Sequence, residues 1–417
     1  MSDTLAMKSH RDASNSFLGP FGTRLTYIGV EVKALETESG NSFVRCIVHR
    51  ASIMIALIVS VLVTPLAIQF GKQRQSPGVL KALAVVVTPI NVLWVPLEFV
   101  PDCHIQNCGI FFIIGWLATF KTIGCAFGRG PLCADGMTLL GTYVTYALPI
   151  NPADALPSAG TGPKERKSTV TYMWDAVRHL VLLIGGTGLS HRLQRLPYGP
   201  TGAVHMLASD LADAVNLYAF IAVIMNVASV FMSTRGERML GFSDIMAHCD
   251  RPWLATSFGE FWARRWNVNT SYALRYLCYD PICEGSMVKR PAPPKRRRCS
   301  GVRRVIAVAT TFAVSGLVHE CFIYWLRGVH SGHGRWFLFF FLQTPLIVVV
   351  DPWLKSLKRT TGPWLALALT VCGQLVMAHY LFFVPVFQLG ITDDIHSGVK
   401  HGIRMLLSES LFQVVYP

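Results

Sequence analysis

The apolar run VIAVATTFAVSGLVHECFIYWL, residues 305–326, decides the fold class of this chain. A membrane-spanning helix needs about 20 predominantly apolar residues, and this run is that long although it carries His319 and Glu320. An ionisable side chain at such a depth is costly, so we expect it to have a partner or a chemical task. A histidine that faces a cavity can remove a proton from a hydroxyl group near neutral pH.

Similar runs occur along the whole chain, at 51–70, 79–100, 109–127, 211–232, 336–354 and 364–387. Two shorter runs, 137–150 and 176–189, are candidates for re-entrant, interfacial or buried segments. Every backbone polar group must be satisfied inside lipid, and no ten-residue alternation typical of a membrane barrel occurs. The sequence therefore predicts an all-α, polytopic transmembrane bundle of about seven to nine spans with a central reaction cavity.

Composition agrees with a membrane protein, because 52% of the 417 residues are hydrophobic and only 15% are charged, against about 25% charged residues in soluble domains. Residues 1–46 are polar and lack the apolar core of a signal peptide. We expect them to form a cytosolic tail, and residues 47–417 to form a single membrane-embedded domain.

Much of the net charge of +14 lies between 235 and 304, where 14 Lys/Arg face 6 Asp/Glu. Loops rich in Lys and Arg stay on the cytosolic side, so segment 233–304 is predicted to face the cytosol. With spans on both sides of the segment, nucleic acid is not an expected partner. Topology alone, anionic lipid or an anionic substrate all remain open as explanations of the charge.

The eleven cysteines are scattered and contain no CxxC pair. Their spacing fits no zinc site, so we expect no metal and mostly reduced, small apolar side chains. Cys103 and Cys108 form the one pair considered for a disulfide. No bound cofactor is expected either.

A polar-aromatic block, Ser257 to Asn267, precedes the 305–326 run, and an amphipathic helix is predicted near 258–279. Arg264 and Arg265 are of the type that pairs with phosphate groups, or that holds an interfacial helix against lipid headgroups. Asn267 offers one acceptor and two donors, although asparagine also favours helix caps and turns.

The two stretches Phe261-Trp262-Ala263-Arg264-Arg265-Trp266-Asn267 and Ser315-Gly316-Leu317-Val318-His319-Glu320, in this order and roughly 50 residues apart, resemble the signature of the membrane-bound O-acyltransferase superfamily, in particular its wax synthase-like branch. The resemblance implies that His319 and Asn267 are catalytic. It also implies that an aromatic and basic set lies near acyl-CoA, namely Trp262, Arg264, Arg265 and Trp266. Ser315 and Glu320 would support the histidine.

By this resemblance, domain 47–417 transfers an acyl group from acyl-CoA, its co-substrate, to a lipophilic alcohol in a multi-pass protein of the endoplasmic reticulum. Similar proteins of fungal natural-product pathways favour acetyl transfer from acetyl-CoA to a hydroxylated terpenoid or meroterpenoid. Formation of wax esters from long-chain alcohols and fatty acyl groups is the alternative. A transporter is the alternative of another class, but no internal repeat supports it.

Two other histidines carry weaker signals. His205 and Asp210 have the His-x4-Asp spacing of glycerolipid acyltransferases, a spacing that arises easily by chance. His379 lies in the run 364–387, where it could line the same cavity as His319 or bond to a helix backbone.

Overall fold

The computed structural model describes Ile55, 58–97, Asn107, 109–153, 168–195, 202–242, 244–289, Cys299 and 301–391. By contacts the chain divides into two units, Met1–Ser52 and Ile53–Pro417, and all that follows concerns the second. The predicted tail 1–46 and the pair Cys103 and Cys108 lie outside the described residues.

Helices make up almost all of the regular structure in the described part of the chain, and the one β element there is an isolated bridge between Pro152 and Ile245. This confirms the all-α prediction. The helices before residue 150 are η2 (Val59–Val63), α4 (Thr64–Gln73), α5 (Pro77–Pro89), η3 (Ile90–Trp94), α6 (Val95–Leu97), η4 (Phe111–Ala118), α8 (Thr119–Ala126), η5 (Pro131–Cys133) and α9 (Leu139–Ala147).

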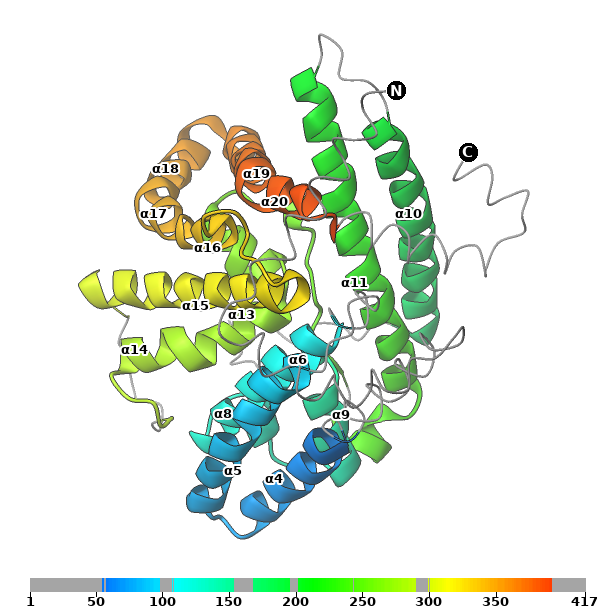
Figure 1. Cartoon of the computed structure of the whole chain (residues 1–417), viewed down its shortest axis with the longest axis vertical. Helices are drawn as coiled ribbons and strands as arrows, with labels where there is room; N and C mark the ends of the chain where they lie inside the picture. The colour runs from blue at the N-terminus through cyan, green and yellow to red at the C-terminus, as the bar shows by residue number, and fades with distance from the viewer. Residues whose placement is uncertain are drawn as a thin grey trace, which may run out of the picture. The chain divides into compact units, whose positions relative to one another are not determined.

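Two long helices follow, α10 (Thr169–Arg195) and α11 (Gly202–Leu240), which run side by side in Figure 1. The polar-aromatic block and its continuation form short elements: η7 (Pro252–Leu254), α12 (Phe258–Glu260), η8 (Phe261–Arg265), α13 (Val268–Leu274), η9 (Arg275–Tyr279) and α14 (Asp280–Glu284). The C-terminal part contains α15 (Gly301–Arg327), α16 (Arg335–Phe341), α17 (Gln343–Pro345), η10 (Leu346–Val350), α18 (Asp351–Thr361), α19 (Pro363–Ala378), η11 (His379–Phe383) and α20 (Val384–Gln388).

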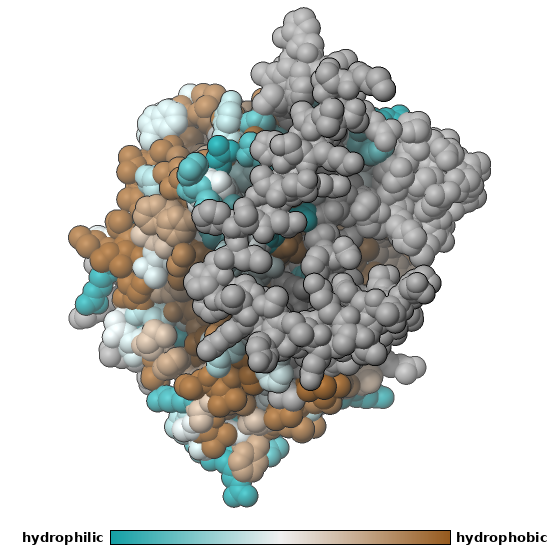
Figure 2. All heavy atoms as spheres, viewed as in Figure 1, coloured by the Kyte–Doolittle hydropathy of each residue, from teal (hydrophilic) through white to brown (hydrophobic). Residues whose placement is uncertain are grey.

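Five helical stretches among the described residues are long and apolar enough to cross a membrane: Pro77–Trp94, Leu207–Met232, Gly301–Arg327, Arg335–Thr361 and Pro363–Gln388. Each overlaps a run predicted as a span, which confirms a polytopic helical membrane protein. Large apolar side chains also point outward, and brown residues are spread widely over the coloured surface in Figure 2. Trp364, for example, is 74% exposed, as expected of a side chain in contact with lipid.

Three other predicted runs differ from the expectation in length, and the run 51–70 lies partly outside the described residues. The run 109–127 becomes the shorter apolar helix Phe111–Ala126, and 137–150 contains only α9. The run 176–189 lies inside the 27-residue α10, so the helix continues into polar residues that the hydropathy pattern leaves out.

The single amphipathic helix predicted near 258–279 is wrong, because the chain is divided at Asn267. This residue has left-handed backbone angles, with φ 43° and ψ 56°. Asparagine is one of the few residues that adopts this conformation readily, so a break replaces the predicted continuous face.

Cysteine pairing differs in one place from the prediction. Cys283 and Cys299 form a disulfide that joins the end of α14 to the residues just before α15. Six other cysteines in the described residues are free. Disulfides persist mainly in oxidising compartments, so this bond bears directly on the topology of the basic segment.

Candidate active site

His319 lies in the second half of α15, and its Nδ1 is 2.7 Å from the carbonyl oxygen of Ser315, one turn earlier. A carbonyl oxygen only accepts hydrogen bonds, so the proton of the neutral imidazole sits on Nδ1. The lone pair is then on Nε2, which has no hydrogen-bond partner among the described residues. Ser315 therefore supports the histidine through its backbone, and the arrangement leaves Nε2 able to accept a proton.

Aromatic rings surround this imidazole on several sides. The Phe340 ring is the nearest, with centroids 4.1 Å apart, and the rings of Trp116, Trp336 and Phe112 follow at 5.4, 5.6 and 5.7 Å. These rings come from two separate parts of the chain, η4 and α16. We call these four rings the chamber of His319; they make the surroundings of the imidazole apolar, so few protein groups there can bond to Nε2.

Close packing of α15 on α16 places two of these rings. A Cβ atom at Gly316 would come within 2.9 Å of the Phe337 Cα and 3.0 Å of its carbonyl oxygen. Real Cβ contacts are longer, so only glycine permits this approach. Gly316 thus lets Trp336 and Phe340 reach His319.

Glu320 fastens the same two helices instead of touching the imidazole. Its carboxylate accepts hydrogen bonds from the backbone N–H of Ser331 at 3.1 Å and of Phe337 at 3.0 Å, and from the Ser331 hydroxyl. The loop between α15 and α16 is thereby tied to α15. The Ser315 carbonyl therefore fixes the tautomer of His319. Glu320 fixes the position of α16, which carries Trp336 and Phe340.

Segment η4 contributes Phe112 and Trp116, which the sequence alone did not bring to the site. It is wound as a π-helix, and such widened turns are frequent at functional sites. The available signal was the aromatic pair spaced four residues apart in an apolar run, a pattern that is common in lipid-facing helices and so gives little warning.

A carboxylate 92 residues farther along the chain holds the start of the polar-aromatic block in place. Asp351, at the start of α18, accepts hydrogen bonds from the backbone N–H of Phe258 at 2.8 Å and of Gly259 at 2.9 Å. The Ser257 hydroxyl accepts the Glu260 N–H at 3.1 Å. These acceptors satisfy the first N–H groups of the helical turn, which explains the start of the block at Ser257.

The two adjacent arginines have different surroundings. Arg265 contacts Glu260, with Nη2 2.6 Å and Nε 2.8 Å from Oε1, and donates to the Asp250 carbonyl at 3.1 Å. Burial alone would raise the pKa of the Glu260 carboxyl, but hydrogen bonds from Thr256 and Arg265 outweigh it, and the net pKa is lowered. Arg264 is exposed and has no ion pair among the described residues.

The two tryptophans of the block also differ in the rings that they contact. Trp262 packs in the core, with its ring 5.7 Å from that of Phe340, which in turn lies against His319. Trp266 stacks on Phe261 at 5.9 Å. The block is therefore linked to His319 through a shared phenylalanine.

Asn267 caps α13, where its Oδ1 accepts the Thr270 N–H at 3.2 Å. The cap uses the acceptor and leaves the two amide donors without a partner in the described residues. Asn267 makes no direct hydrogen bond to His319 there. The structure thus contains the cap that the sequence allowed, formed by the side-chain oxygen alone.

His248 lies beside this cap and escaped the sequence analysis. Its carbonyl oxygen accepts the Val268 N–H at 2.7 Å, and its Nδ1 is 3.4 Å from the amide of the buried Asn269. Burial lowers the pKa of the His248 imidazole to about 4, so this histidine is neutral at pH 7. Its Nε2 is buried without a hydrogen-bond partner among the described residues.

Asp210 bonds to His379 across helices, with 2.6 Å between Oδ2 and Nδ1. Asp210 is 1% and His379 7% exposed, so the pair is buried between α11 and η11. The partner of His379 is a carboxylate, neither a helix carbonyl nor a group of the His319 chamber. The His205-x4-Asp210 spacing therefore coincides with an interhelical contact.

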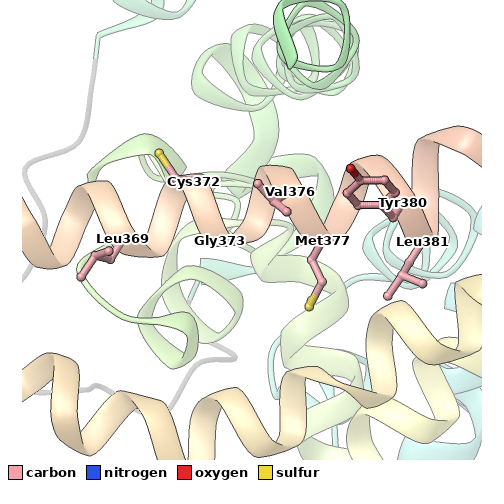
Figure 3. A pocket seen from close by; sticks show the side chains of 7 residues that line it. All are labelled: Leu369, Cys372, Gly373, Val376, Met377, Tyr380 and Leu381. Atoms are coloured by element: carbon pink, nitrogen blue, oxygen red, sulfur yellow. The ribbon is translucent and has the colours of Figure 1, made fainter. Parts of the chain in front are cut away.

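An apolar groove of about 580 Å³ lies along α19 and η11 (Figure 3). Its lining is Leu369, Cys372, Gly373, Val376, Met377, Tyr380 and Leu381. Met377 and Leu381 also pack against the core cluster that contains Phe340. Two lining residues of the groove thus pack in the same hydrophobic cluster as Phe340, one of the rings beside His319.

Comparison with known proteins shows which proteins this part of the chain is similar to. Residues 246–342, which include Asn267 and His319, match the Membrane bound O-acyl transferase family. Over 79% of its length, the chain is 27% identical to a protein of Arabidopsis thaliana, "Probable long-chain-alcohol O-fatty-acyltransferase 3", 90% of which is covered.

Two further relatives are similar at the same level. The chain is 26% identical to "Acyl-CoA--sterol O-acyltransferase 1" of Arabidopsis thaliana over 72% of the chain and 81% of the relative. It is 28% identical to "Long-chain-alcohol O-fatty-acyltransferase" of Simmondsia chinensis over 60% of the chain and 64% of the relative. The chain is thus similar to a membrane-bound O-acyltransferase family over residues 246–342 and, over most of its length, to long-chain-alcohol and sterol O-acyltransferases.

Proposed function

We propose that this protein transfers an acyl group from acyl-CoA to the hydroxyl of a lipophilic alcohol inside the membrane. The observation that carries the proposal is the His319 imidazole, whose Nδ1 is bonded to the Ser315 carbonyl, whose Nε2 has no hydrogen-bond partner among the described residues, and whose ring is surrounded by aromatic side chains. An alcohol needs a general base to become a nucleophile at neutral pH, and a neutral imidazole with a free Nε2 is suited to that task.

In the proposed reaction the alcohol oxygen attacks the thioester carbonyl carbon, and its proton passes to His319 Nε2. The carbon–sulfur bond then breaks, and the CoA thiolate takes the proton back from the imidazolium. The products are the ester and free CoA, and no redox step is involved. The Asn267 amide donors hold the thioester or the acceptor near the imidazole.

Acyl-CoA approaches, in this proposal, from the side where the basic residues gather. Arg264 is the exposed arginine of the block, and Lys358 at the end of α18 donates to the hydroxyl of Thr256, which directly precedes the block, at 3.1 Å. This contact brings the start of the block close to the basic end of α18, so we place both on the same side of the membrane. Basic loops favour the cytosol. Arg264 would bind a CoA phosphate.

A topology experiment tests this approach. A single cysteine placed near Lys295 should react with a membrane-impermeant maleimide once the plasma membrane alone is permeabilised. Protection until the internal membranes are opened would move acyl-CoA entry to the other side. That result would agree with the Cys283–Cys299 disulfide, which is typical of an oxidising lumen.

The acceptor would come from the bilayer, and the apolar groove on α19 supports such a route. Long-chain alcohols and sterols are the acceptors in the names of the relatives, and they favour a fatty acyl donor for this chain. Acetyl transfer to a hydroxylated terpenoid, expected from the resemblance, is the second candidate.

The decisive measurement uses purified wild-type protein and the His319→Ala variant. Each is incubated with radiolabelled acetyl-CoA or palmitoyl-CoA and with hexadecanol, a sterol or a hydroxylated terpenoid. We expect ester formation in at least one combination, lost in the variant. Wild-type protein that binds the substrates but forms no ester in any combination would refute the proposed function.

A further inference from the structure

Two tryptophans flank the His319 imidazole, and their indole N–H groups differ. Trp336 donates its Nε1–H to the carbonyl oxygen of Phe382 at 2.9 Å. Trp116 stands edge-on to the imidazole, with centroids 5.4 Å apart and planes at 81°. Its Nε1 is buried and has no hydrogen-bond partner among the described residues. Both residues are 4% exposed, so burial is equal and only the partner is missing.

A buried N–H without a partner has lost its hydrogen bond to water and gained nothing in exchange. Such groups are rare, and each one calls for an explanation such as a catalytic role or a bound molecule. An indole N–H only donates, so the missing partner of Trp116 is an acceptor atom. In the proposed reaction one acceptor atom gains charge beside His319, the carbonyl oxygen of the acyl thioester.

We propose that Trp116 is an oxyanion donor of this acyltransferase, an inference that rests on the proposed function. As the alcohol oxygen bonds to the carbonyl carbon and its proton moves to His319 Nε2, the carbonyl electron pair moves onto oxygen. The Trp116 N–H donates to that oxygen. When the carbonyl forms again and the carbon–sulfur bond breaks, the charge leaves on the CoA thiolate. Trp116 itself gives up no proton.

Neighbouring rings hold the indole in place for this task. Phe112 packs on Trp116 at 5.7 Å, and Phe120 meets it edge-on at 5.8 Å. Phe112 also contacts the His319 ring at 5.7 Å. A donor fixed before the reaction needs no reorganisation as charge develops, which is the condition for effective oxyanion stabilisation.

The test compares three Trp→Phe variants, because phenylalanine keeps an aromatic ring and removes the N–H. Trp116→Phe should lower kcat by about 10²-fold with the KM for acyl-CoA changed less than threefold. Its thermal stability should match that of the wild type, since no protein hydrogen bond is lost. Trp336→Phe should lower the melting temperature, because the bond to Phe382 is lost. Trp364→Phe, at an exposed position, should change neither.

Trp116→His provides the rescue, since an imidazole N–H replaces the donor; we expect it to recover at least part of the lost kcat. If Trp116→Phe does not fold, Trp116→His carries the test alone. In that case turnover within about tenfold of wild type supports the donor role, and turnover as low as that of His319→Ala contradicts it. A folded Trp116→Phe protein with wild-type kcat also refutes the role. An inactive wild type would instead indicate that the proposed function has failed.

Discussion

Two intramembrane histidines, His319 in α15 and His379 in η11, both bond through Nδ1, but to partners of different chemistry. The partner of His319 is a backbone carbonyl of its own helix, and aromatic rings enclose the imidazole. The partner of His379 is the carboxylate of Asp210, on another helix. A carbonyl fixes the tautomer and offers no countercharge, whereas a carboxylate can pair with an imidazolium.

The contrast shows that the same residue type has different surroundings at two places in the bundle. The partner of His319 lies on its own helix, and its Nε2 has no hydrogen-bond partner among the described residues. His379 joins α11 to η11 and thus ties the α10–α11 pair to the C-terminal helices. We infer that His319 belongs to the chemistry and His379 to the assembly of the bundle.

The largest effect is expected at His319. Replacement by alanine removes the base, and general-base catalysis contributes on the order of 10²–10⁴ in rate. Turnover of radiolabelled acyl-CoA by the purified variant measures the loss, with unchanged elution and melting as the control for folding. A variant that keeps more than half of wild-type turnover would contradict the assignment.

Asp210→Ala tests the other half of the comparison. Removing the carboxylate leaves the buried His379 Nδ1 without its partner, and hydrogen bonds to charged groups contribute about 1.5–3 kcal/mol. We expect a loss of about 2 kcal/mol in the free energy of unfolding, measured by thermal melting in detergent. Turnover per folded molecule should stay within about threefold of wild type. A drop in kcat of the size seen for His319→Ala would place His379 in the chemistry and end the distinction.

Gly316→Ala perturbs the chamber without touching an ionisable group. The added Cβ would meet the Phe337 backbone at 2.9 Å, so α16 must shift together with Trp336 and Phe340. Overpacking of this kind costs about 1–3 kcal/mol, and we expect kcat to fall through misplaced rings. Ala313→Gly, on the same helix, serves as the control for helix propensity. Wild-type kcat and stability in Gly316→Ala would show that the close approach is not needed.

The smallest effects are expected at the two adjacent arginines, of which Arg265 has an ion-pair partner and Arg264 has none among the described residues. Arg264→Ala should raise the KM for acyl-CoA several-fold, with unchanged stability, because the exposed guanidinium is free to bind phosphate. Arg265→Ala should lower stability, because Glu260 loses its partner. Since the pKa of Glu260 is lowered by folding, this stabilisation is present above its unfolded pKa and is lost as pH falls through the folded pKa. An unchanged KM in Arg264→Ala would assign that residue to lipid headgroups or topology.

Local patterns accounted for a good part of these assignments. Run length predicted the helical class and located the five long apolar helices. It could do so because a helix in lipid satisfies its backbone polar groups within its own segment. The adjacent motif residues singled out His319 and Asn267 before any contact was known. The end of the amphipathic helix at Asn267 was missed, because hydrophobic periodicity continues through a residue whose backbone turns left-handed.

By itself, the sequence determined that the chain is a helical membrane protein and which histidine lies in the stretch that resembles the acyltransferase signature. Only the tertiary structure decided what each polar group bonds to: Asp351 to the block, Glu320 to the next helix, Asp210 to His379, and Trp116 to no group among the described residues. These partners lie up to 169 residues apart in the chain. Hydrogen bonds form between atoms within about 3 Å in space, and no local pattern specifies which distant residue will occupy that position.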